Sequence, residues 1–208
     1  MMLEKNVTEF IKELSSASPV PGGGGACAAV GAFAAALGMM VANLTTGKKR
    51  YAEVEDEIRD VRDRLTELIS ELEELVDKDA AAFEPLAEAY GLPKETAEER
   101  EQKERIMEKA LYDASVVPLE IMRTIHKAMK LLAVLEEKGS RIAVSDAGVG
   151  ILFAQAALNG ASLNIFINTK LMKDRERAEE LNHKADALIE AGECLREEVY
   201  QSVIGKIR

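Results

Sequence analysis

The chain is poor in the residues that metal sites and disulfides need. Its 208 residues include two cysteines, Cys27 and Cys194, and two histidines, His126 and His183. The cysteines stand far apart, and neither a Cys-x-x-Cys nor a His-x-x-His spacing occurs. We therefore expect no disulfide, no metal site and no catalytic triad, and free thiols favour a cytoplasmic protein.

The scarcity of several other residue types narrows the range of possible folds. Tryptophan is absent, aromatic residues make up 4%, and only 5 prolines interrupt a composition rich in alanine, leucine, glutamate and lysine, which favours helices. A length of 208 residues suits one domain spanning residues 1–208. Acidic residues outnumber basic ones, and the formal net charge of −10 argues against nucleic acid as a partner. No apolar signal segment is expected at the start.

Residues 14–47 carry no charged side chain, so a membrane-spanning helix has to be considered. The stretch from Gly25 to Leu44 is long enough to cross a bilayer. Its alanines and glycines insert weakly, however, and the mean hydropathy of the whole chain is −0.10. We therefore predict no membrane partner and a buried central helix of small residues, which neighbouring helices or a two-fold dimer partner can approach closely.

The periodicity of apolar residues predicts helices along the whole chain. A long stripe from Val54 to Val76 is the clearest example. The charged stretch 94–112 is either a solvated helix or a mobile crossover. Residues 141–144 and 163–167 could be short strands on propensity, although their context favours helix. The prediction is an all-α bundle of about eight helices, with the main helical segments at residues 3–16, 24–46, 51–90, 113–138, 146–158, 162–171 and 174–204.

The most informative segment begins Ser18-Pro19-Val20-Pro21 and continues with four glycines, Gly22 to Gly25. No Gly-Lys-Ser/Thr follows and no strand is expected before it, so the run is neither a phosphate-binding P-loop nor a dinucleotide fingerprint. It is either a flexible loop between helices or a turn whose backbone comes close to a ligand. Free N–H groups at such a helix start favour anionic groups.

Two aspartates stand among small or apolar residues. Asp79 is followed by Ala80–Phe83, and burial there would raise its pKa into a range useful for proton transfer. The alternative is a solvent-facing Asp79 paired with Lys78. Asp146 precedes Ala-Gly-Val-Gly, and it is either a helix N-cap or an acid–base group beside close-packed glycines.

Amide and basic side chains complete the set of candidates. Asn164 and Asn168 stand four apart and share a helix face, so their amides either hold a polar ligand or bond to nearby backbone. A basic triplet is either a charge cluster at a helix C-terminus or a site for a carboxylate. The triplet is Lys48, Lys49 and Arg50, and the other candidates are Asn43 and a second basic group, Lys170, Lys173 and Arg175.

Four segments together resemble the formiminotetrahydrofolate cyclodeaminase family. They are Ser-Pro-x-Pro-Gly-Gly-Gly from residue 18, Val-Ala-Asn-Leu-Thr-x-Gly-Lys-Lys-x-Tyr from residue 41, Asp-Ala-Gly-Val-Gly from residue 146 and Asn-Ile-x-Ile-Asn from residue 164. The family includes the cyclodeaminase half of a bifunctional formiminotransferase–cyclodeaminase and stand-alone bacterial methenyltetrahydrofolate cyclohydrolases. The resemblance covers essentially the whole chain.

The resemblance implies an enzyme of folate one-carbon metabolism that converts 5-formimino-tetrahydrofolate to 5,10-methenyl-tetrahydrofolate and releases ammonia, with no metal or redox cofactor. The resemblance does not fix residue roles, and our hypothesis is that Asp79 and Asp146 are the carboxylates that handle protons or hold the pterin. The expected substrate-binding residues are Pro21, Gly22, Gly23, Gly24, Asn43, Lys48, Lys49, Asn164, Asn168 and Lys170. The lysines would meet the glutamate end of a folate that is expected to be polyglutamylated.

Two other interpretations stay open. A methenyltetrahydrofolate cyclohydrolase would add water to the methenyl bridge in the same pocket. The given sequence shows no formiminotransferase domain, which favours this interpretation, since a separate formiminotransferase would have to supply a formimino substrate. The second interpretation is a non-catalytic helical protein that binds folate or serves oligomerisation. In each case we expect a homodimer.

Overall fold

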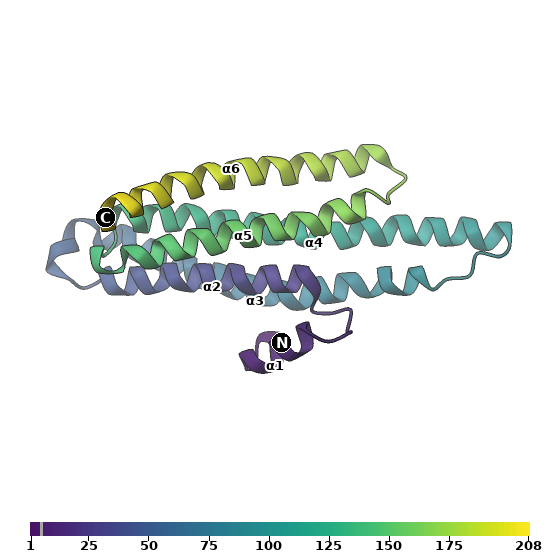
Figure 1. Cartoon of the computed structure of the whole chain (residues 1–208), viewed down its shortest axis with the longest axis horizontal. Coiled ribbons are helices and arrows are strands. Elements are labelled where there is room, and N and C mark those ends of the chain that lie inside the picture. The colour runs from purple at the N-terminus through teal and green to yellow at the C-terminus, as the bar shows by residue number, and fades with distance from the viewer. Residues whose placement is uncertain (5) are drawn as a thin grey trace.

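The described residues, 1–4 and 6–208, form six α-helices in the computed structural model (Figure 1). Lys5, which belongs to the predicted helix 3–16, lies outside them. The described residues also form three 3-10 segments and no strand. The helices are α1 (Val7–Leu14), α2 (Gly22–Thr45), α3 (Glu55–Tyr90), α4 (Ala97–Lys138), α5 (Val144–Thr169) and α6 (Arg175–Ile207), and the 3-10 segments are Met2–Glu4, Lys49–Val54 and Arg141–Ala143.

The helix count is lower than the predicted eight because two predicted breaks are helical. The charged stretch 94–112 joins the following segment in α4, which starts at Thr96 with a reciprocal cap to Glu99. The predicted stop at Asn159-Gly160 lies inside α5. Gly160 serves close packing there, because a Cβ at this position would stand 2.6 Å from the Sγ of Cys27. Residues 163–167, considered as a strand, are helical too.

The apolar stripe predicted from Val54 to Val76 forms, from Ile58 onward, the buried face of α3, which confirms that prediction. Ile58, Leu65 and Leu72 recur every seven residues, and each is fully buried. Burying one such side chain contributes about 1.5–3 kcal/mol relative to leaving it exposed. The opposite face of α3 carries charged pairs such as Arg59 with Glu55, so α3 presents one face to the bundle and one to solvent.

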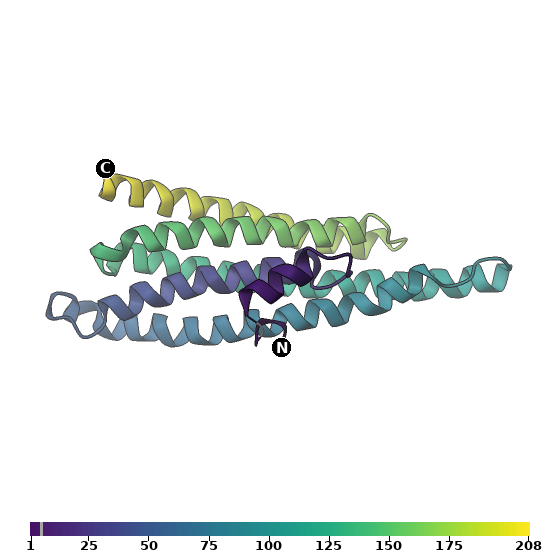
Figure 2. The ribbon, with the colours of Figure 1, turned by 60° about the horizontal axis from the view of Figure 1, so that its bottom comes forward.

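α2 forms a wall of the bundle and not its centre, which corrects the predicted central helix. It packs against α3, α4 and α5, while its outward side chains Phe33 and Met40 are each 48% exposed. Figure 2 shows α1 lying across the bundle outside α2 and α3, and Figure 1 shows the α3–α4 hairpin extending past the other helices. α2 and the segment Arg141–Thr169 are long and apolar enough to cross a membrane, and about half of each is buried inside the bundle.

Glycines set the spacing between the apolar helices. A Cβ on Gly31 in α2 would stand 2.7 Å from the Cγ1 of Ile125, and one on Gly150 in α5 would stand 3.2 Å from the carbonyl oxygen of Ala34. Since Gly150 lies beside Ala34 and Gly160 beside Cys27, α2 and α5 run antiparallel. Backbone therefore approaches backbone along the length of this helix pair.

Replacing a core isoleucine tests this packing. Ile125→Ala should lower the free energy of unfolding by about 2–5 kcal/mol, because Ile125 is fully buried and fills the space above Gly31. The matched control is Ile142→Ala, since Ile142 is 89% exposed and its truncation should change stability by no more than about 0.5 kcal/mol. Urea denaturation followed by circular dichroism gives both values, and equal losses would contradict the packing.

Candidate functional site

The start of α2 meets α3 at Asp79. Gly22 has a φ of 59°, in the left-handed region that favours glycine. A Cβ built on Gly24 would overlap both carboxylate oxygens of Asp79, so this contact also requires glycine. The glycines are the first turn of a helix packed against a carboxylate, and the interpretation as a flexible loop is wrong.

Burial determines the charge of Asp79. It raises the pKa of this carboxyl from its ordinary value of 3.8 to about 6, while a hydrogen bond from the Gly25 backbone acts in the opposite direction. Burial, with a smaller effect from the charge of Asp79, raises the pKa of the Cys27 thiol to about 11. Lys78 pairs with Glu74 at 3.2 Å. The result is a carboxyl group able to hold or accept a proton near neutral pH.

α5 supplies the amide groups on the other side of the glycine turn. The side chain of Asn164 lies 3.5 Å from where a Cβ on Gly23 would stand, and its Nδ2 donates to the carbonyl of Gly160 at 3.2 Å. Asn168 is buried, and its Nδ2 donates to the carbonyl of Ala114 in α4 at 3.2 Å. Asn164 therefore faces the turn and keeps its Oδ1 as an acceptor, while the amide of Asn168 ties α5 to α4.

These contacts define the glycine-turn cluster, which consists of Pro21–Gly25, Cys27, Asp79 and Asn164. Lys170 is exposed and caps the end of α5, six residues beyond Asn164 or about 9 Å along the helix axis. No group of three His, Cys, Asp or Glu side chains among the described residues is arranged to hold a metal ion. The cluster offers one proton carrier, one amide and nearby backbone, which suits acid–base chemistry on a small molecule.

Cys27 is the member of this cluster that the sequence analysis left out. Its position three residues after Gly24 was the available signal, since residues three and four apart share a helix face. Nothing in the sequence, however, placed Gly160 against it. The thiol stays neutral at neutral pH because its pKa is raised, so it contributes bulk and a weak hydrogen-bond donor beside Asp79.

The other predicted residues lie at the opposite end of the bundle. Asn43, the triplet Lys48–Arg50 and Asp146 form a second group, called here the basic-end cluster. Along α5, Asp146 is separated from Asn164 by 18 residues, or roughly 27 Å of helix. The chain therefore brings Asp79 and Asn164 together but keeps Asp146 and the triplet away from them.

Two hydrogen bonds from backbone N–H groups to side-chain hydroxyls connect the segments beside the basic-end cluster. The N–H of Ser140 donates to the Oγ1 of Thr45 at 2.8 Å, and the N–H of Arg141 donates to the hydroxyl of Tyr51 at 3.1 Å. They fasten the turn after α2 to the turn before α5. Asp146 lies in the first turn of α5, whose N-cap residue is Ala143, so the interpretation of Asp146 as an N-cap is wrong.

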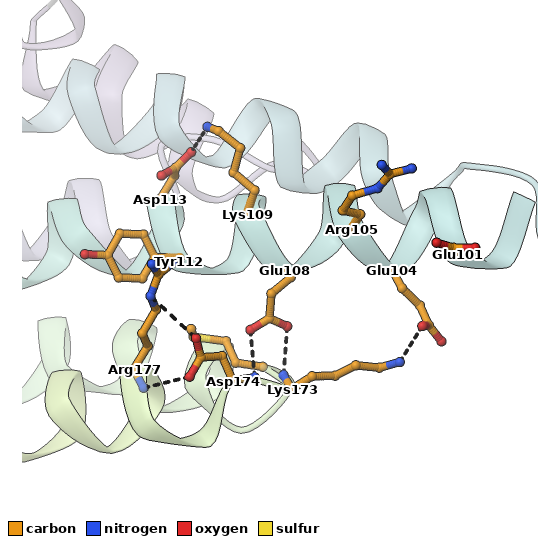
Figure 3. Close-up of a pocket in the computed structure, with 11 residues that line it drawn as sticks. Glu101, Glu104, Arg105, Glu108, Lys109, Tyr112, Asp113, Lys173, Asp174 and Arg177 are labelled. Carbon is orange, nitrogen blue, oxygen red and sulfur yellow. Dashed lines mark hydrogen bonds and ion pairs between the residues drawn. The ribbon is translucent and has the colours of Figure 1, made fainter. Parts of the chain in front are cut away.

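A cleft of about 830 Å³ between α4 and the start of α6 shares no lining residue with either cluster (Figure 3). Most of its charged groups are bound to groups of the chain itself. Lys173 pairs with Glu104 at 2.5 Å, and Glu108 accepts hydrogen bonds from the backbone N–H groups of Lys173 and Asp174. Arg175 is likewise bound to the carbonyl of Thr169 at 2.7 Å. This part of the second basic group therefore holds the α5–α6 turn in place.

The raised pKa of Asp79 has a consequence for stability. Between about pH 4 and pH 6 the folded chain keeps a proton on Asp79 that the unfolded chain releases, so the contribution of this group to the free energy of unfolding falls as pH rises. Relative to the wild type, the free energy of unfolding of Asp79→Asn should therefore rise by up to about 3 kcal/mol between pH 4 and pH 7. Urea denaturation across this range measures it, with Asp186→Asn, an exposed aspartate, as control. Parallel pH profiles for all three proteins would contradict the burial of Asp79.

Known proteins are similar to this chain in sequence and in architecture. Residues 6–187 match the family model described as formiminotransferase-cyclodeaminase. The chain is 39% identical over 203 residues to a methenyltetrahydrofolate cyclohydrolase of Methylorubrum extorquens, with 98% of each chain covered. It is 32% identical over 189 residues to the formimidoyltransferase-cyclodeaminase of Mus musculus, where the match spans 91% of this chain and 35% of the mouse protein.

A solved structure agrees over the full length. The crystal structure of formiminotetrahydrofolate cyclodeaminase from Thermotoga maritima matches with a TM-score of 0.83 and 29% identity, covering 100% of this chain and 98% of that one. In sequence and in fold, the chain thus matches proteins named for two related folate reactions. The chain belongs to the formiminotransferase-cyclodeaminase family of folate one-carbon enzymes.

Proposed function

We propose that this protein is a methenyltetrahydrofolate cyclohydrolase, which adds water across the methenyl bridge of 5,10-methenyl-tetrahydrofolate. The observation that carries the proposal is the partly buried carboxyl of Asp79, which is held against the first turn of α2 and whose pKa burial raises to about 6. Similarity supports the same choice, since the relative named for this reaction is 39% identical and matches along 98% of both chains. This choice reverses the order of the two reactions in the sequence-based expectation.

The proposed chemistry needs one proton acceptor. The methenyl carbon lies between two nitrogens that share a positive charge, so an ionised Asp79 beside it is electrostatically favourable. Asp79 takes a proton from the attacking water as the new carbon–oxygen bond forms. Asp79 delivers this proton to one nitrogen as the bond from carbon to that nitrogen breaks. The hydroxyl on the carbon gives up its own proton to solvent, and a formyl group remains on the other nitrogen. Asn164 and the backbone of the glycine turn would orient the pterin.

Cyclodeamination is the second candidate. The Thermotoga maritima structure named for it matches the whole chain with a TM-score of 0.83. In that reaction N10 attacks the formimino carbon, a tetrahedral intermediate forms, and ammonia leaves after it has gained a proton. The reaction therefore needs a group that accepts one proton and donates another, which Asp79 could do in succession.

Two assays on the purified protein separate the candidates. Rapid loss of added 5,10-methenyl-tetrahydrofolate above the rate without enzyme, with no ammonia formed from 5-formimino-tetrahydrofolate, supports the cyclohydrolase. Formation of both methenyl product and ammonia from the formimino substrate supports the cyclodeaminase instead. A folded protein that is silent in both assays would refute catalysis and leave the binding or oligomerisation interpretation.

Removing the carboxyl tests the role of Asp79. Asp79→Asn should lower kcat/KM by at least about 100-fold, in the range usual for loss of a general base. In the wild type, kcat/KM should rise through about pH 6, since the ionised carboxylate is the acceptor and its pKa lies there. Steady-state rates between pH 5 and pH 8 measure both effects. Unchanged turnover in the variant would remove Asp79 from the reaction.

Gly24→Ala tests the contact between the first turn of α2 and the carboxyl group of Asp79 without changing Asp79 itself. The added methyl group would overlap the Asp79 carboxylate, a side-chain end that can move away, so the carboxyl should be displaced while the helix remains. We expect at least about a 10-fold loss of kcat/KM with the free energy of unfolding changed by about 1 kcal/mol or less. Gly205→Ala is the matched control, because a Cβ there meets open space. Equal activity in the two variants would contradict the proposed arrangement.

A further inference from the structure

A second cavity, of about 280 Å³, opens between the start of α4 and the turn that joins α5 to α6. It adjoins the larger cleft of Figure 3, with which it shares Glu104, Glu108 and Lys173. We call it the hairpin pocket, because the connection between α3 and α4 contributes one of its walls. The lining residues that set it apart from the larger cleft are Lys94, Arg100, Lys103, Met107, Leu111 and Leu171.

Three cations of the hairpin pocket have no acidic partner. Among the described residues, no carboxylate oxygen lies within 4 Å of the side-chain nitrogens of Lys94, Arg100 or Lys103. The two carboxylates that line the pocket are both bound to the turn between α5 and α6. The pocket is therefore electropositive in a protein whose net charge is −10, and an anionic group is the ligand that it favours.

Backbone carbonyl groups hold two of these cations in place. The Nζ of Lys103 donates to the carbonyl oxygens of Tyr90 at 2.8 Å and Leu92 at 2.7 Å. The guanidinium of Arg100 donates to the carbonyl oxygen of Glu95 at 2.9 Å. An ammonium has three N–H donors and a guanidinium five, so both side chains keep donors for a ligand. Because they are already fixed, they lose little conformational freedom when a carboxylate binds.

The remainder of the hairpin pocket is apolar. Met107 and Leu111 belong to the side of α4 that packs on the core, and Leu171 is 51% exposed. Exposed apolar surface beside fixed cations suits a ligand that joins carboxylates to methylene groups or to a ring. A small inorganic anion would use the cations alone and leave this apolar surface uncovered.

The hairpin pocket lies beyond the glycine-turn cluster along the bundle. The glycine turn contacts both Asp79 and Asn164, so these two side chains lie at about the same level. Both α3 and α5 run antiparallel to α2 and continue from this level toward the pocket. Leu171 follows Asn164 by seven residues, or about 10 Å, and Tyr90 follows Asp79 by eleven residues, or roughly 16 Å of helix.

A folate is elongated, with its pterin at one end and its carboxylates at the other. Each further γ-linked glutamate adds at least about 3.5 Å, the reach of one extended residue, so a tail of several glutamates covers the distance to the pocket. The basic-end cluster, in which Lys48 and Lys49 were expected to meet the tail, lies in the opposite direction from Asp79. Lys170 is exposed between Asn164 and Leu171, on the way to the hairpin pocket.

We propose that the hairpin pocket binds the γ-linked glutamate tail of the folate whose reacting bridge lies beside Asp79. The inference rests on the proposed folate function. Lys94, Arg100 and Lys103 contact the tail carboxylates, and Leu171 packs against the methylene groups of the tail. Since the pocket lies about 10 Å or more from the level of Asp79, it acts on substrate binding and not on the reacting bridge. A longer tail therefore lowers KM and leaves kcat unchanged.

Two forms of 5,10-methenyl-tetrahydrofolate test the proposal, one with a single glutamate and one with four. For the wild type, the four-glutamate form should have a KM lower by at least about 5-fold, the effect of two or more exposed charge pairs. The double variant Lys94→Gln/Arg100→Gln should lose this difference. In 0.5 M salt the difference should also shrink, because exposed charges are screened.

The matched control is Lys127→Gln/Lys130→Gln, which removes two exposed charges from another part of α4. These lysines lie at least 16 residues, or about 24 Å, from Leu111, so the control should keep the wild-type preference for the longer tail. Lys94→Glu guards against a folding effect, because the Lys94 side chain makes no hydrogen bond or ion pair within the described part of the chain. It should raise the KM of the four-glutamate form by at least about 5-fold with unchanged circular dichroism.

The outcomes separate the pocket from the reaction. Equal KM values for the two substrates in the wild type overturn the proposal, and so does a double variant that keeps the difference. If the wild type converts neither substrate, the proposed function fails, and calorimetric titration with p-aminobenzoyl-tetraglutamate, which has no pterin, decides the pocket. Binding that the double variant weakens supports the pocket, whereas absent or unchanged binding refutes it. Equally effective competition by inorganic phosphate would indicate a general anion site and refute recognition of the tail.

Discussion

The close approach of the α2 backbone to Asp79 is the constraint on which the site depends. A helix that starts with four glycines can bring its first turn against a carboxyl group, and any larger residue at Gly24 would displace that group. The contact buries Asp79 and raises its pKa, even though a Gly25 hydrogen bond and the helix dipole favour the charged form. Position and proton affinity therefore have the same structural origin.

The same small residues shape the rest of the bundle. Gly31, Gly150 and Gly160 let α2, α4 and α5 pack closely. Backbone is buried at these contacts, and the contacting faces of α2 and α5 carry few large apolar side chains. Larger apolar residues of α2 and α5 then stand on the outer side, where Phe33 and Phe153 remain exposed. A helix pair built in this way is apolar on two faces, and α1 covers part of the outer face of α2.

The sequence predicted the parts that depend on local pattern. The α3 stripe, the all-helical class and the candidacy of Asp79 followed from spacing and from neighbouring residues. The merging of predicted helices did not, because Asn159-Gly160 looks like a stop until Cys27 is seen to occupy the space beside it. The division of the predicted residues between two ends was equally hidden, since it depends on the antiparallel pairing of α2 with α5.

That division bears on the choice between the two folate reactions. Hydrolysis of a methenyl bridge takes two protons from water, one of which goes to a nitrogen and the other to solvent, and one carboxyl with a pKa near 6 can carry them in succession. Cyclodeamination must take a proton from the attacking N10 and also protonate the departing ammonia, so it gains more from a second carboxyl on the other side of the substrate. Within one chain, Asp146 lies about 27 Å along α5 from Asn164, so the groups beside Asp79 suit hydrolysis better than cyclodeamination.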